Sequence, residues 1–480
     1  MRKTKIICTL GPAVDNPEIL EQLMLAGMDV ARINFSHGNY EEQQDRIERV
    51  KEVRKKVNKP ISLLLDTKGP EIRIGKFVKD MIMLNKGDTF ILTNKDILGD
   101  ETKVSVTYKN LYNEVQIGTK ILINDGTIET IVRKIEDQDI ICEVINGGKL
   151  TNRKSINIPG MNINLPSITQ KDIEDIKFGI IAGFDYIAAS FVRKPEDVMA
   201  IRKILEENNG THIKIIAKIE NREGINNFDK ILEVSDGIMV ARGDLGVEIP
   251  MEEVPIRQKE FISKCSKAGK PVIIATQMLE SMILNPRPTR AEVSDVANAI
   301  YDMSSCIMLS GESATGNYPI ECVRTMAKIS ETIEKSIKYW KRFKNKDCKT
   351  ENKDLEFSLN YSTCCTAMEL NAKAIFAYTN TGRTATMLSG FLPQCPIYII
   401  TDNEIAYRQM SLLWNINPIL VSNNRNIDEM INEGVEKAKQ NNYIQKDDII
   451  VIAGGASILS CHDGAVSYTH LRAHETGAYL

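Results

Sequence analysis

Eight short apolar segments alternate with amphipathic helical segments, and this alternation restricts the fold more than any other feature of the sequence. The expected strands span residues 4–8, 30–34, 62–66, 186–189, 214–219, 237–241, 272–276 and 306–309. Helical segments such as 17–26, 40–57, 171–182, 195–208 and 255–268 lie between them. Repeated strand–helix units are typical of parallel sheets, and eight of them predict an α/β fold with a (β/α)8 TIM barrel.

The count of eight holds only if residues 70–166 are an insertion after the third strand. This segment has no convincing helix, and turn signals at 86–88, 124–126 and 146–148 separate short β-forming runs. We therefore expect an inserted all-β lid domain of the β-barrel type, hinged at Pro70 and Pro166. The barrel then comprises residues 1–69 and 167–340, close to the length of about 250 residues typical of this fold.

A third unit follows a charged linker at residues 341–355. Strands expected at 374–378, 397–400, 419–421 and 449–453, separated by helices, predict an open C-terminal α/β domain over residues 356–464. The loop 379–384 leads from a strand into a helix, where backbone N–H groups and hydroxyls can hold a phosphate. Its candidate residues are Thr379, Thr381, Gly382 and Thr384, although helix caps use the same residue types.

Residues 465–480 depart from the pattern of the rest of the chain. From Val466 the sequence matches the translation of a common transposon-based sequencing adapter. We expect this tail to be non-native and exclude it from the fold prediction.

Composition and charge exclude several classes of function. The chain has 480 residues, 42% of them hydrophobic and 26% charged, as in soluble globular proteins. Its net charge of −3 indicates no general attraction to nucleic acid, and no segment is long and apolar enough to span a membrane. The ten cysteines form no Cys-x-x-Cys pair, so we expect reduced thiols and a cytoplasmic protein without structural zinc.

Polar residues follow most of the expected barrel strands. Barrel enzymes build their active sites at the carboxyl ends of the strands. Here those ends carry Arg32, Asn34, Ser36 and His37, then Asp66, Thr67 and Lys68, then Lys218 and Glu220, then Arg242, Gly243 and Asp244, then Thr276 and Gln277, and last Ser310 and Glu312. Helix capping alone does not explain so many polar positions on one rim.

Lys218, Glu220 and Asp244 indicate a metal site that handles anions. Mg²⁺ takes oxygen ligands and is usually held by one or two carboxylates together with substrate oxygens. Lys218 and Glu220 are two positions apart, so both side chains lie on the same face of an extended strand. A surface salt bridge between them is the alternative, but the preceding residues 213–219 are largely apolar and indicate a buried strand.

The chain resembles the pyruvate kinase family over almost its whole length. The matching stretches are 4–12, 31–38, 66–73, 218–221, 236–246 and 275–281. This resemblance implies transfer of a phosphoryl group from phosphoenolpyruvate to ADP, giving pyruvate and ATP, with Mg²⁺ (or Mn²⁺) and K⁺ as cofactors.

The resemblance also implies roles for individual residues. Metal binding falls to Glu220 and Asp244 for Mg²⁺ and to Asn34, Ser36, Asp66 and Thr67 for K⁺. Lys218 and Arg32 are expected to bind the substrate and to act in catalysis. The substrate carboxylate is expected to be bound by Gly243 and Asp244 with Thr276. A proton relay is expected from Thr276, Ser310 and Glu312. Nucleotide contacts are expected from Arg73, His37 and Lys154.

Further expectations follow from the same resemblance. Glu71 stands where K⁺-dependent members of the family carry Glu and K⁺-independent members carry Lys, which predicts K⁺ dependence. A homotetramer and a phosphorylated small-molecule effector at the loop 379–384 are expected, with no nucleic-acid or membrane partner. The family's last strand is replaced here by the adapter-like tail, so we expect a truncated C-terminal domain whose sheet has an exposed edge.

Two other functions fit parts of the pattern. A metal-dependent aldolase acting on a pyruvate enolate could use the same carboxylates on a TIM barrel, but it gives no reason for the insertion or for the run 66–73. A catalytically inactive relative acting as a binding protein is the second, but every polar position that the chemistry needs is occupied. ADP-dependent formation of pyruvate separates both from the kinase.

Overall fold

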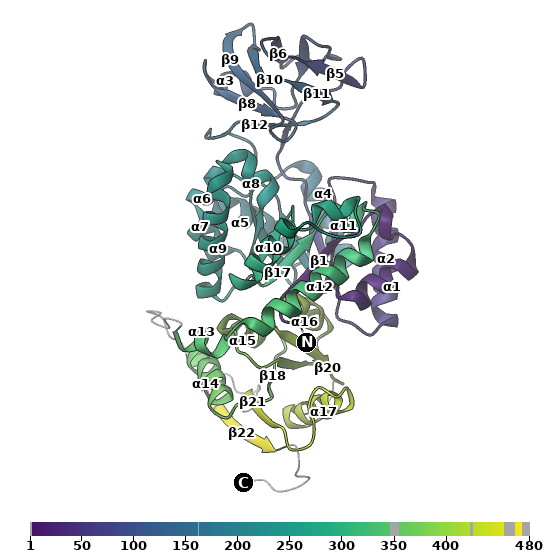
Figure 1. Cartoon of the computed structure of the whole chain (residues 1–480), viewed down its shortest axis with the longest axis vertical. Helices are drawn as coiled ribbons and strands as arrows, with labels where there is room; N and C mark the ends of the chain where they lie inside the picture. The colour runs from purple at the N-terminus through teal and green to yellow at the C-terminus, as the bar shows by residue number, and fades with distance from the viewer. Residues whose placement is uncertain (1, 162, 346–354, 423–425, 456–465, 473–480) are drawn as a thin grey trace.

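The computed structural model describes residues 2–161, 163–345, 355–422, 426–455 and 466–472 and arranges them in three stacked layers (Figure 1). The inserted segment lies at one end, the barrel in the middle and the C-terminal unit at the other end. The N-terminus lies at the joint between the barrel and the C-terminal unit. Outside the described residues lie 346–354 of the expected linker, 423–425 and 456–464 of the expected C-terminal domain, and 465 and 473–480 of the expected tail.

The predicted eight-stranded barrel is confirmed. Its strands run parallel and close in the order β1-β17-β16-β15-β14-β13-β3-β2. Their bounds are β1 Lys5–Thr9, β2 Val30–Asn34, β3 Ser62–Asp66, β13 Tyr186–Ala189, β14 Lys214–Ile219, β15 Gly237–Ala241, β16 Val272–Ala275 and β17 Cys306–Leu309. Because all eight run in the same direction, their carboxyl ends meet at one rim.

Helices surround the barrel. They are α1 Pro17–Ala26, α2 Tyr40–Lys56, α4 Gln170–Ala182, α5 Pro195–Glu207, α6 Arg222–Asn226, α7 Phe228–Val234, α8 Arg242–Glu248, α9 Val254–Ala268, α10 Arg290–Tyr301, α11 Gly311–Ala314 and α12 Pro319–Ser336. Their starts follow local chemistry: the side chain of Asn16 accepts a hydrogen bond from the N–H of Glu18, and Thr169 and Asp172 form a capping box.

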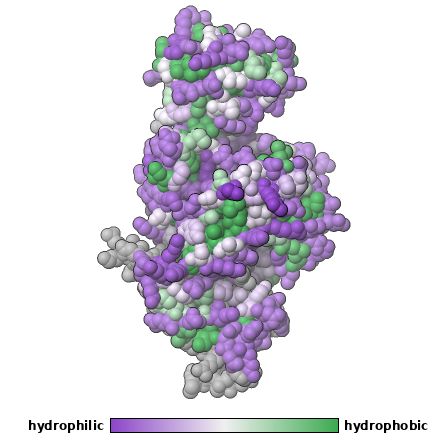
Figure 2. Space-filling model, viewed as in Figure 1, coloured by the Kyte–Doolittle hydropathy of each residue, from purple (hydrophilic) through white to green (hydrophobic). Residues whose placement is uncertain are grey.

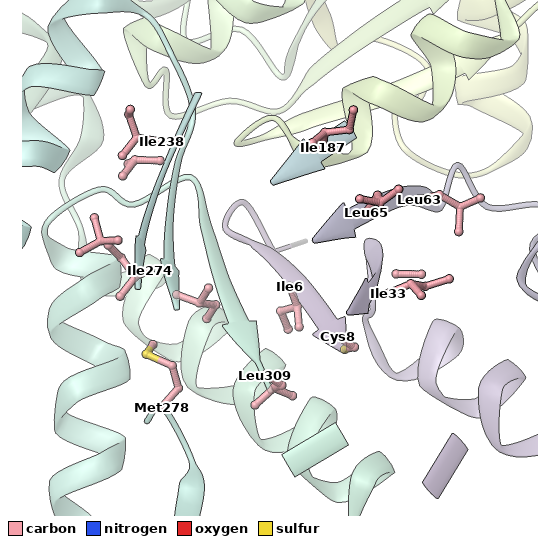
Figure 3. Close-up of a cluster of buried hydrophobic side chains, with 14 of the residues drawn as sticks. Ile6, Cys8, Ile33, Leu63, Leu65, Ile187, Ile238, Ile274, Met278 and Leu309 are labelled. Atoms are coloured by element: carbon pink, nitrogen blue, oxygen red, sulfur yellow. The ribbon is translucent and has the colours of Figure 1, made fainter. Parts of the chain in front are cut away.

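Alternate residues of the strands face opposite sides of the barrel wall. Ile6 and Cys8 join a cluster between the strands and the surrounding helices, together with Leu309 (Figure 3). Ile7, between them, belongs to a separate interior cluster. Leu412 of the C-terminal unit completes that interior cluster, so the third unit closes the amino-terminal end of the barrel.

The insertion is built almost entirely of strands. They are β4 Ile72–Arg73, β5 Met81–Leu84, β6 Thr89–Thr93, β7 Lys103–Ser105, β8 Lys120–Ile123, β9 Ile128–Glu136, β10 Asp139–Asn146, β11 Gly148–Thr151 and β12 Ser155–Asn157. Seven form one sheet in the order β4-β12-β8-β9-β10-β6-β7, and β11 pairs with β5. A bridge between Ile74 and Val106 connects the two edges of the seven-stranded sheet.

One short helix interrupts the insertion, so the expectation of a helix-free segment is wrong by one turn. Helix α3 spans Leu111–Glu114 and buries Leu111 in the core of the insertion. Four residues carry too little periodicity to be predicted from sequence.

Hydrogen bonds from Arg193 fix the returning end of the insertion. Its guanidinium group donates to the carbonyls of Ile163, Leu165 and Pro166 at 3.0, 2.7 and 3.0 Å. On the other side of the joint, the Asn157 amide donates to Glu248 at 2.9 Å. The joint between the two units is therefore held by polar contacts next to the barrel rim.

The C-terminal unit contains helices on both sides of a five-stranded sheet. Helix α13 Tyr339–Asn345 extends into the stretch assigned to the linker, and the further helices are α14 Leu355–Glu369, α15 Arg383–Phe391, α16 Glu404–Gln409 and α17 Ile427–Gln440. The strands are β18 Ala374–Tyr378, β19 Ile397–Thr401, β20 Ile416–Leu420, β21 Ile449–Gly455 and β22 Val466–Arg472, in the order β20-β19-β18-β21-β22.

The expectation of an exposed edge beside β21 is wrong. Strand β22, which consists of adapter-like residues, pairs antiparallel with β21 along its length, from Ile449 opposite Arg472 to Gly455 opposite Val466. Ladder hydrogen bonds use backbone groups only, so an extended segment of unrelated sequence can cover the edge.

The surface is mostly hydrophilic on the face seen in Figure 2, with an apolar patch over the barrel layer. Within the described part of the chain, no helix has the length and hydrophobicity needed to cross a membrane.

Candidate active site

Lys218 lies at the centre of a buried polar cluster on the barrel rim. Its ammonium lies 2.9 Å from Glu220, 3.1 Å from Asp66 and 2.7 Å from the hydroxyl of Ser190. These groups come from the carboxyl ends of β14, β3 and β13, and Glu220 is on the same side of the chain as Lys218, as the spacing predicts. The Lys218–Glu220 pair is a buried ion pair rather than the surface salt bridge considered above.

Asp66 joins Lys218 to Arg32. One carboxylate oxygen accepts a hydrogen bond from the Arg32 guanidinium at 2.7 Å, and the other accepts from Lys218 and from Ser190. Burial alone would raise the pKa of Asp66, but Arg32 and Lys218 lower it below its ordinary value. Arg32 also donates to the Thr9 hydroxyl at 2.7 Å. The cluster therefore fixes two cations at the centre of the rim.

The same contacts keep Lys218 charged. Burial by itself lowers the pKa of a lysine, but Asp66 and Glu220 outweigh burial and raise the pKa of Lys218 above its ordinary value. A permanently charged ammonium is suited to stabilising negative charge on a reacting group.

Glu220 and Asp244 have the donor chemistry that a divalent cation needs. Burial, together with the charge of Asp244, raises the pKa of Glu220 to about 7 despite the opposing effect of Lys218. The N–H of Phe191 donates to the second oxygen of Glu220 at 2.6 Å and fixes its orientation. Among the described residues no group of three or more His, Cys, Asp or Glu side chains is placed to hold a metal ion by itself. Two carboxylates fit Mg²⁺ bound together with substrate oxygens.

Thr276 and Gly243 meet where β15 and β16 end. The Gly243 N–H donates to the Thr276 hydroxyl at 2.8 Å. Thr276 and Gln277 have φ values of +66° and +54°, a region that is rare for a β-branched residue such as Thr276. Arg242 stabilises this backbone, because its guanidinium donates to the carbonyls of Thr276 and Gln277 at 2.7 and 3.1 Å.

Ser310 and Glu312 are joined through the backbone. The buried Glu312 carboxylate accepts hydrogen bonds from the N–H groups of Ser310 and Leu279, at 2.8 and 3.0 Å. The Ser310 hydroxyl is buried and has no hydrogen-bond partner among the described residues. The structure thus brings Ser310 and Glu312 of the expected proton relay together, and the Ser310 hydroxyl is available to bind a substrate.

The four expected K⁺ ligands lie on the adjacent ends of β2 and β3. Asn34 pairs with Asp66 in the sheet register, and the Asn34 side chain accepts from the Ser36 N–H at 3.0 Å. The Ser190 hydroxyl donates to the Thr67 carbonyl at 2.7 Å. Both carboxylate oxygens of Asp66 are already used by Arg32, Lys218 and Ser190.

The expected nucleotide residues lie farther from Lys218. Arg73 forms an ion pair with Glu71 at 2.7 Å, and burial raises the pKa of Glu71 although Arg73 opposes it. Lys154 lies in the insertion, where its carbonyl accepts from the N–H of Ile74, and His37 is exposed after β2. No hydrogen bond or ion pair given for the described residues joins Arg73, His37 or Lys154 to the Lys218 cluster.

The expected effector loop belongs to the C-terminal unit, far from the barrel rim (Figure 1). The Thr379 hydroxyl accepts a hydrogen bond from the Gly382 N–H at 3.1 Å, and Gly382 has a φ of +81°. Helix α15 begins directly after Gly382 without a side-chain cap, and Thr381 and Thr384 flank that start. Backbone N–H groups at the start of a helix can bind an anion.

Sequence reasoning missed Ser190 and did not assign a role to Arg242. Ser190 directly follows β13, the fourth barrel strand. The list of polar residues at the strand ends did not include this strand, and including it would have found Ser190. Arg242 was visible at the end of β15, but its contacts with the carbonyls after β16 depend on the tertiary structure.

The chain is similar to known proteins over most of its length. The family model described as "Pyruvate kinase, barrel domain" matches residues 1–323, and the model described as "Pyruvate kinase, alpha/beta domain" matches residues 358–463. The chain is 49% identical over 456 residues to a pyruvate kinase of Clostridium acetobutylicum, covering 95% of this chain and 96% of that protein. It is also 49% identical to pyruvate kinases of Staphylococcus epidermidis and Bacillus licheniformis, covering 95% of this chain and 78% of each of those proteins.

Proposed function

The chain belongs to the pyruvate kinase family, and from this premise we propose that the rim cluster around Lys218 performs the family's phosphoryl transfer. The family transfers the phosphoryl group of phosphoenolpyruvate to ADP, giving pyruvate and ATP, and is generally metal-dependent. The observation that carries the proposal is the buried ammonium of Lys218 within 3.1 Å of Asp66 and Glu220. Neither the aldolase nor the inactive relative is favoured by the comparisons.

Lys218 and Arg32 neutralise the phosphoryl group during its transfer. Phosphoryl transfer needs little covalent chemistry from the protein and depends on alignment and on compensation of charge. Asp66 and Ser190 hold the Lys218 ammonium in one position, and Asp66 and Thr9 hold Arg32. The two cations therefore need little reorganisation when negative charge develops.

Glu220 and Asp244 hold Mg²⁺ (or Mn²⁺). When bound there, the ion would neutralise part of the negative charge of the substrate. The support for this assignment is the oxygen donors of the two carboxylates, together with the pKa of Glu220, which burial raises and the charge of Asp244 raises further. Asn34, Ser36, Asp66 and Thr67 hold K⁺ through side-chain and carbonyl oxygens.

The substrate carboxylate is held by the N–H groups of Gly243 and Asp244 and by the Thr276 hydroxyl. In the present structure the Gly243 N–H donates to Thr276, so this bond must open or be shared when substrate arrives. Thr276, Ser310 and Glu312 then form the route by which a proton reaches the methylene carbon of the enolate. The support for this route is the buried Ser310 hydroxyl, which lacks a partner among the described residues.

The insertion acts as a lid that carries Arg73 and Lys154 to the nucleotide, while His37 approaches from the barrel. Closure excludes water and so protects the phosphoryl group from hydrolysis. The same proposal divides the chain into the barrel (1–69 and 167–340), the lid (70–166) and the C-terminal domain (356–464).

Three further assignments belong to the proposal. The enzyme assembles as a homotetramer, its loop 379–384 with Thr379, Thr381, Gly382 and Thr384 holds the phosphate of an effector, and it works in the cytoplasm. The cytoplasmic assignment is supported by Cys8, Cys142, Cys265, Cys306, Cys322 and Cys395, which form no disulfide, as suits a reducing compartment.

Pyruvate release from phosphoenolpyruvate, measured with and without ADP, tests the proposed function. The proposal expects release that requires ADP and is accompanied by one ATP per pyruvate. Release without ADP would indicate hydrolysis of the phosphate ester in place of transfer, and no release in the presence of Mg²⁺ and K⁺ would favour the aldolase or the inactive relative.

A further inference from the structure

Phe191 contacts Glu220 through a backbone of unusual conformation. Its φ is +55°, in the left-handed region that residues other than glycine, asparagine and aspartate rarely adopt. Its N–H donates to one carboxylate oxygen of Glu220 at 2.6 Å, while the Lys218 ammonium lies 2.9 Å from the other oxygen. The left-handed conformation and the short hydrogen bond to a buried carboxylate therefore occur at the same residue.

Hydrogen bonds fix the chain on both sides of Phe191. Before it, the Ser190 N–H donates to the Thr67 hydroxyl at 3.1 Å, and the Ser190 hydroxyl donates to the Thr67 carbonyl at 2.7 Å. After it, the Arg193 N–H donates to the Asp197 carboxylate at 2.9 Å. Because its neighbours are fixed, Phe191 is held in a conformation that its own side chain disfavours.

Two glycines bring further backbone close to this segment. A Cβ atom on Gly69 would lie 2.9 Å from the Ser190 carbonyl oxygen and 3.0 Å from the Phe191 ring. One on Gly224 would lie 2.7 Å from the Val192 carbonyl oxygen. Gly69 leads into the insertion and Gly224 follows Glu220 on α6, so the segment is confined from two directions.

The hydrogen bond from Phe191 leaves Glu220 able to bind a cation. An ionised carboxylate has about four lone-pair positions, and Lys218 and Phe191 occupy two of them. With one oxygen held by each partner, the plane of the carboxylate is fixed and the remaining lone pairs keep one direction. Without the Phe191 N–H, the carboxylate is free to rotate about its last bond.

The ring of Phe191 is less confined than its backbone. It lines a cavity of about 90 Å³ at the joint between the barrel and the insertion, and the residue is only half-buried. A smaller or more polar side chain therefore fits at this position. The role of the backbone can be separated from that of the ring by substitution.

We propose that Phe191 is a positioning residue for the metal ion: its left-handed backbone holds Glu220 in the orientation that binds Mg²⁺. The backbone conformation carries this role, and the aromatic ring does not. Phe191 acts on the ion only through Glu220. The proposal rests on the metal site assigned above to Glu220 and Asp244.

Binding of Mn²⁺ alone to the full chain, followed by the electron paramagnetic resonance signal of free Mn²⁺, tests the proposal. Two variants both remove the ring, but asparagine tolerates the left-handed region and the β-branched valine does not. We expect Phe191→Asn to bind Mn²⁺ within about threefold of the original chain, and Phe191→Val to bind it at least about tenfold more weakly. A folded valine variant that binds Mn²⁺ as tightly as the asparagine variant would overturn the proposal.

Leu392 supplies the matched control. It is also half-buried and has a φ of +56°, but it ends α15 in the C-terminal unit. Leu392→Asn and Leu392→Val should both keep the original Mn²⁺ affinity. Thermal melting establishes that each variant is folded. If Phe191→Val does not fold, Phe191→Ala replaces it, with binding at least about threefold weaker than in Phe191→Asn expected and equal binding contradicting the proposal.

Glu220→Gln separates this proposal from the metal site on which it rests. Its Mn²⁺ affinity should fall at least about tenfold, because the charged ligand is lost. Unchanged affinity in Glu220→Gln would refute the metal site and the role of Phe191 together. Weakened binding in Glu220→Gln with equal binding in the two Phe191 variants would refute the role of Phe191 alone.

Discussion

The carboxylate of Asp66 lies 3.1 Å from the ammonium of Lys218, although 152 residues separate them in the chain. Asp66 ends β3 and Lys218 lies near the end of β14, with β13 between the two strands. Asp66 also binds Arg32, so one buried carboxylate positions two cations. This relationship makes Asp66 a positioning residue for the proposed phosphoryl transfer.

Replacing Asp66 with Asn should lower both stability and turnover. The change leaves buried Arg32 without its carboxylate and removes one of the two carboxylates that contact Lys218. Breaking a buried ion pair typically costs about 3–5 kcal/mol of the free energy of unfolding. We expect kcat to fall at least about tenfold, because Lys218 and Arg32 are no longer aligned. Thermal melting and steady-state kinetics measure the two effects.

Asp229→Asn is the control for that variant, because Asp229 is 73% exposed and pairs with Lys264 on the surface. The Asp229→Asn variant should have nearly the same free energy of unfolding and the same kcat as the original chain. An Asp66→Asn enzyme with the stability and kcat of the original chain would contradict the positioning role.

Mg²⁺ affinity should increase as the pH rises through about 7, because the pKa of Glu220 is raised to about 7 and only the carboxylate form binds the ion. In the metal-free protein the folded state holds this proton more tightly than the unfolded chain, whose pKa is near 4.5. Stability should therefore fall as the pH rises from 4.5 towards 7, and saturating Mg²⁺ should remove that fall. Calorimetric titration at pH 6 and pH 8 tests the first effect, and equal affinities would count against Glu220 as a ligand.

Replacing Arg242 with Lys should raise KM for phosphoenolpyruvate about tenfold while changing kcat less. The guanidinium holds the carbonyls of Thr276 and Gln277, and a lysine cannot reproduce this forked contact. Thr276 would then leave its unusual backbone conformation and lose its alignment with Gly243. Arg257→Lys, on a partly exposed ion pair with Glu260, is the control, and an unchanged KM in the Arg242 variant would refute this account.

Replacing Glu71 with Lys should make turnover largely independent of K⁺. Glu71 is half-buried beside Arg73, and a lysine there introduces an ammonium that can substitute for the monovalent cation. Glu71→Gln is the matched control, because it removes the carboxylate without adding a charge. Initial rates with and without K⁺ decide the matter: continued K⁺ stimulation in the lysine variant, or full activity of the original chain without any monovalent cation, would reject the prediction.

The barrel and most of the polar residues on its rim could be predicted, because both are indicated by short stretches of sequence. Apolar runs of four to six residues separated by amphipathic helices indicate β/α units, and polar residues just after those runs fall on one rim. Asp66, Lys218, Glu220 and Glu312 were all found in this way. Their buried contacts in the structure follow from a strand order that the repeated unit dictates.

The features that escaped prediction depend on contacts between distant segments. Ser190 has an ordinary hydroxyl, and only its contacts with Asp66 and Lys218 distinguish it from a helix cap. The positive φ of Thr276 has no local sequence signal, because threonine disfavours it and Arg242 supplies the compensating hydrogen bonds. Strand β22 pairs through backbone groups, so its unusual side chains gave no warning that it would cover β21.

Lys218 carries the proposed phosphoryl transfer, and this role is tested by the rate of ADP-dependent pyruvate formation by Lys218→Met. With Mg²⁺ and K⁺ present, we predict a fall in kcat of about a thousandfold or more, because methionine fills the space without supplying the charge. Lys203→Met, an exposed lysine on α5, should keep the original rate. A folded Lys218→Met enzyme within about tenfold of the original kcat would contradict the claim.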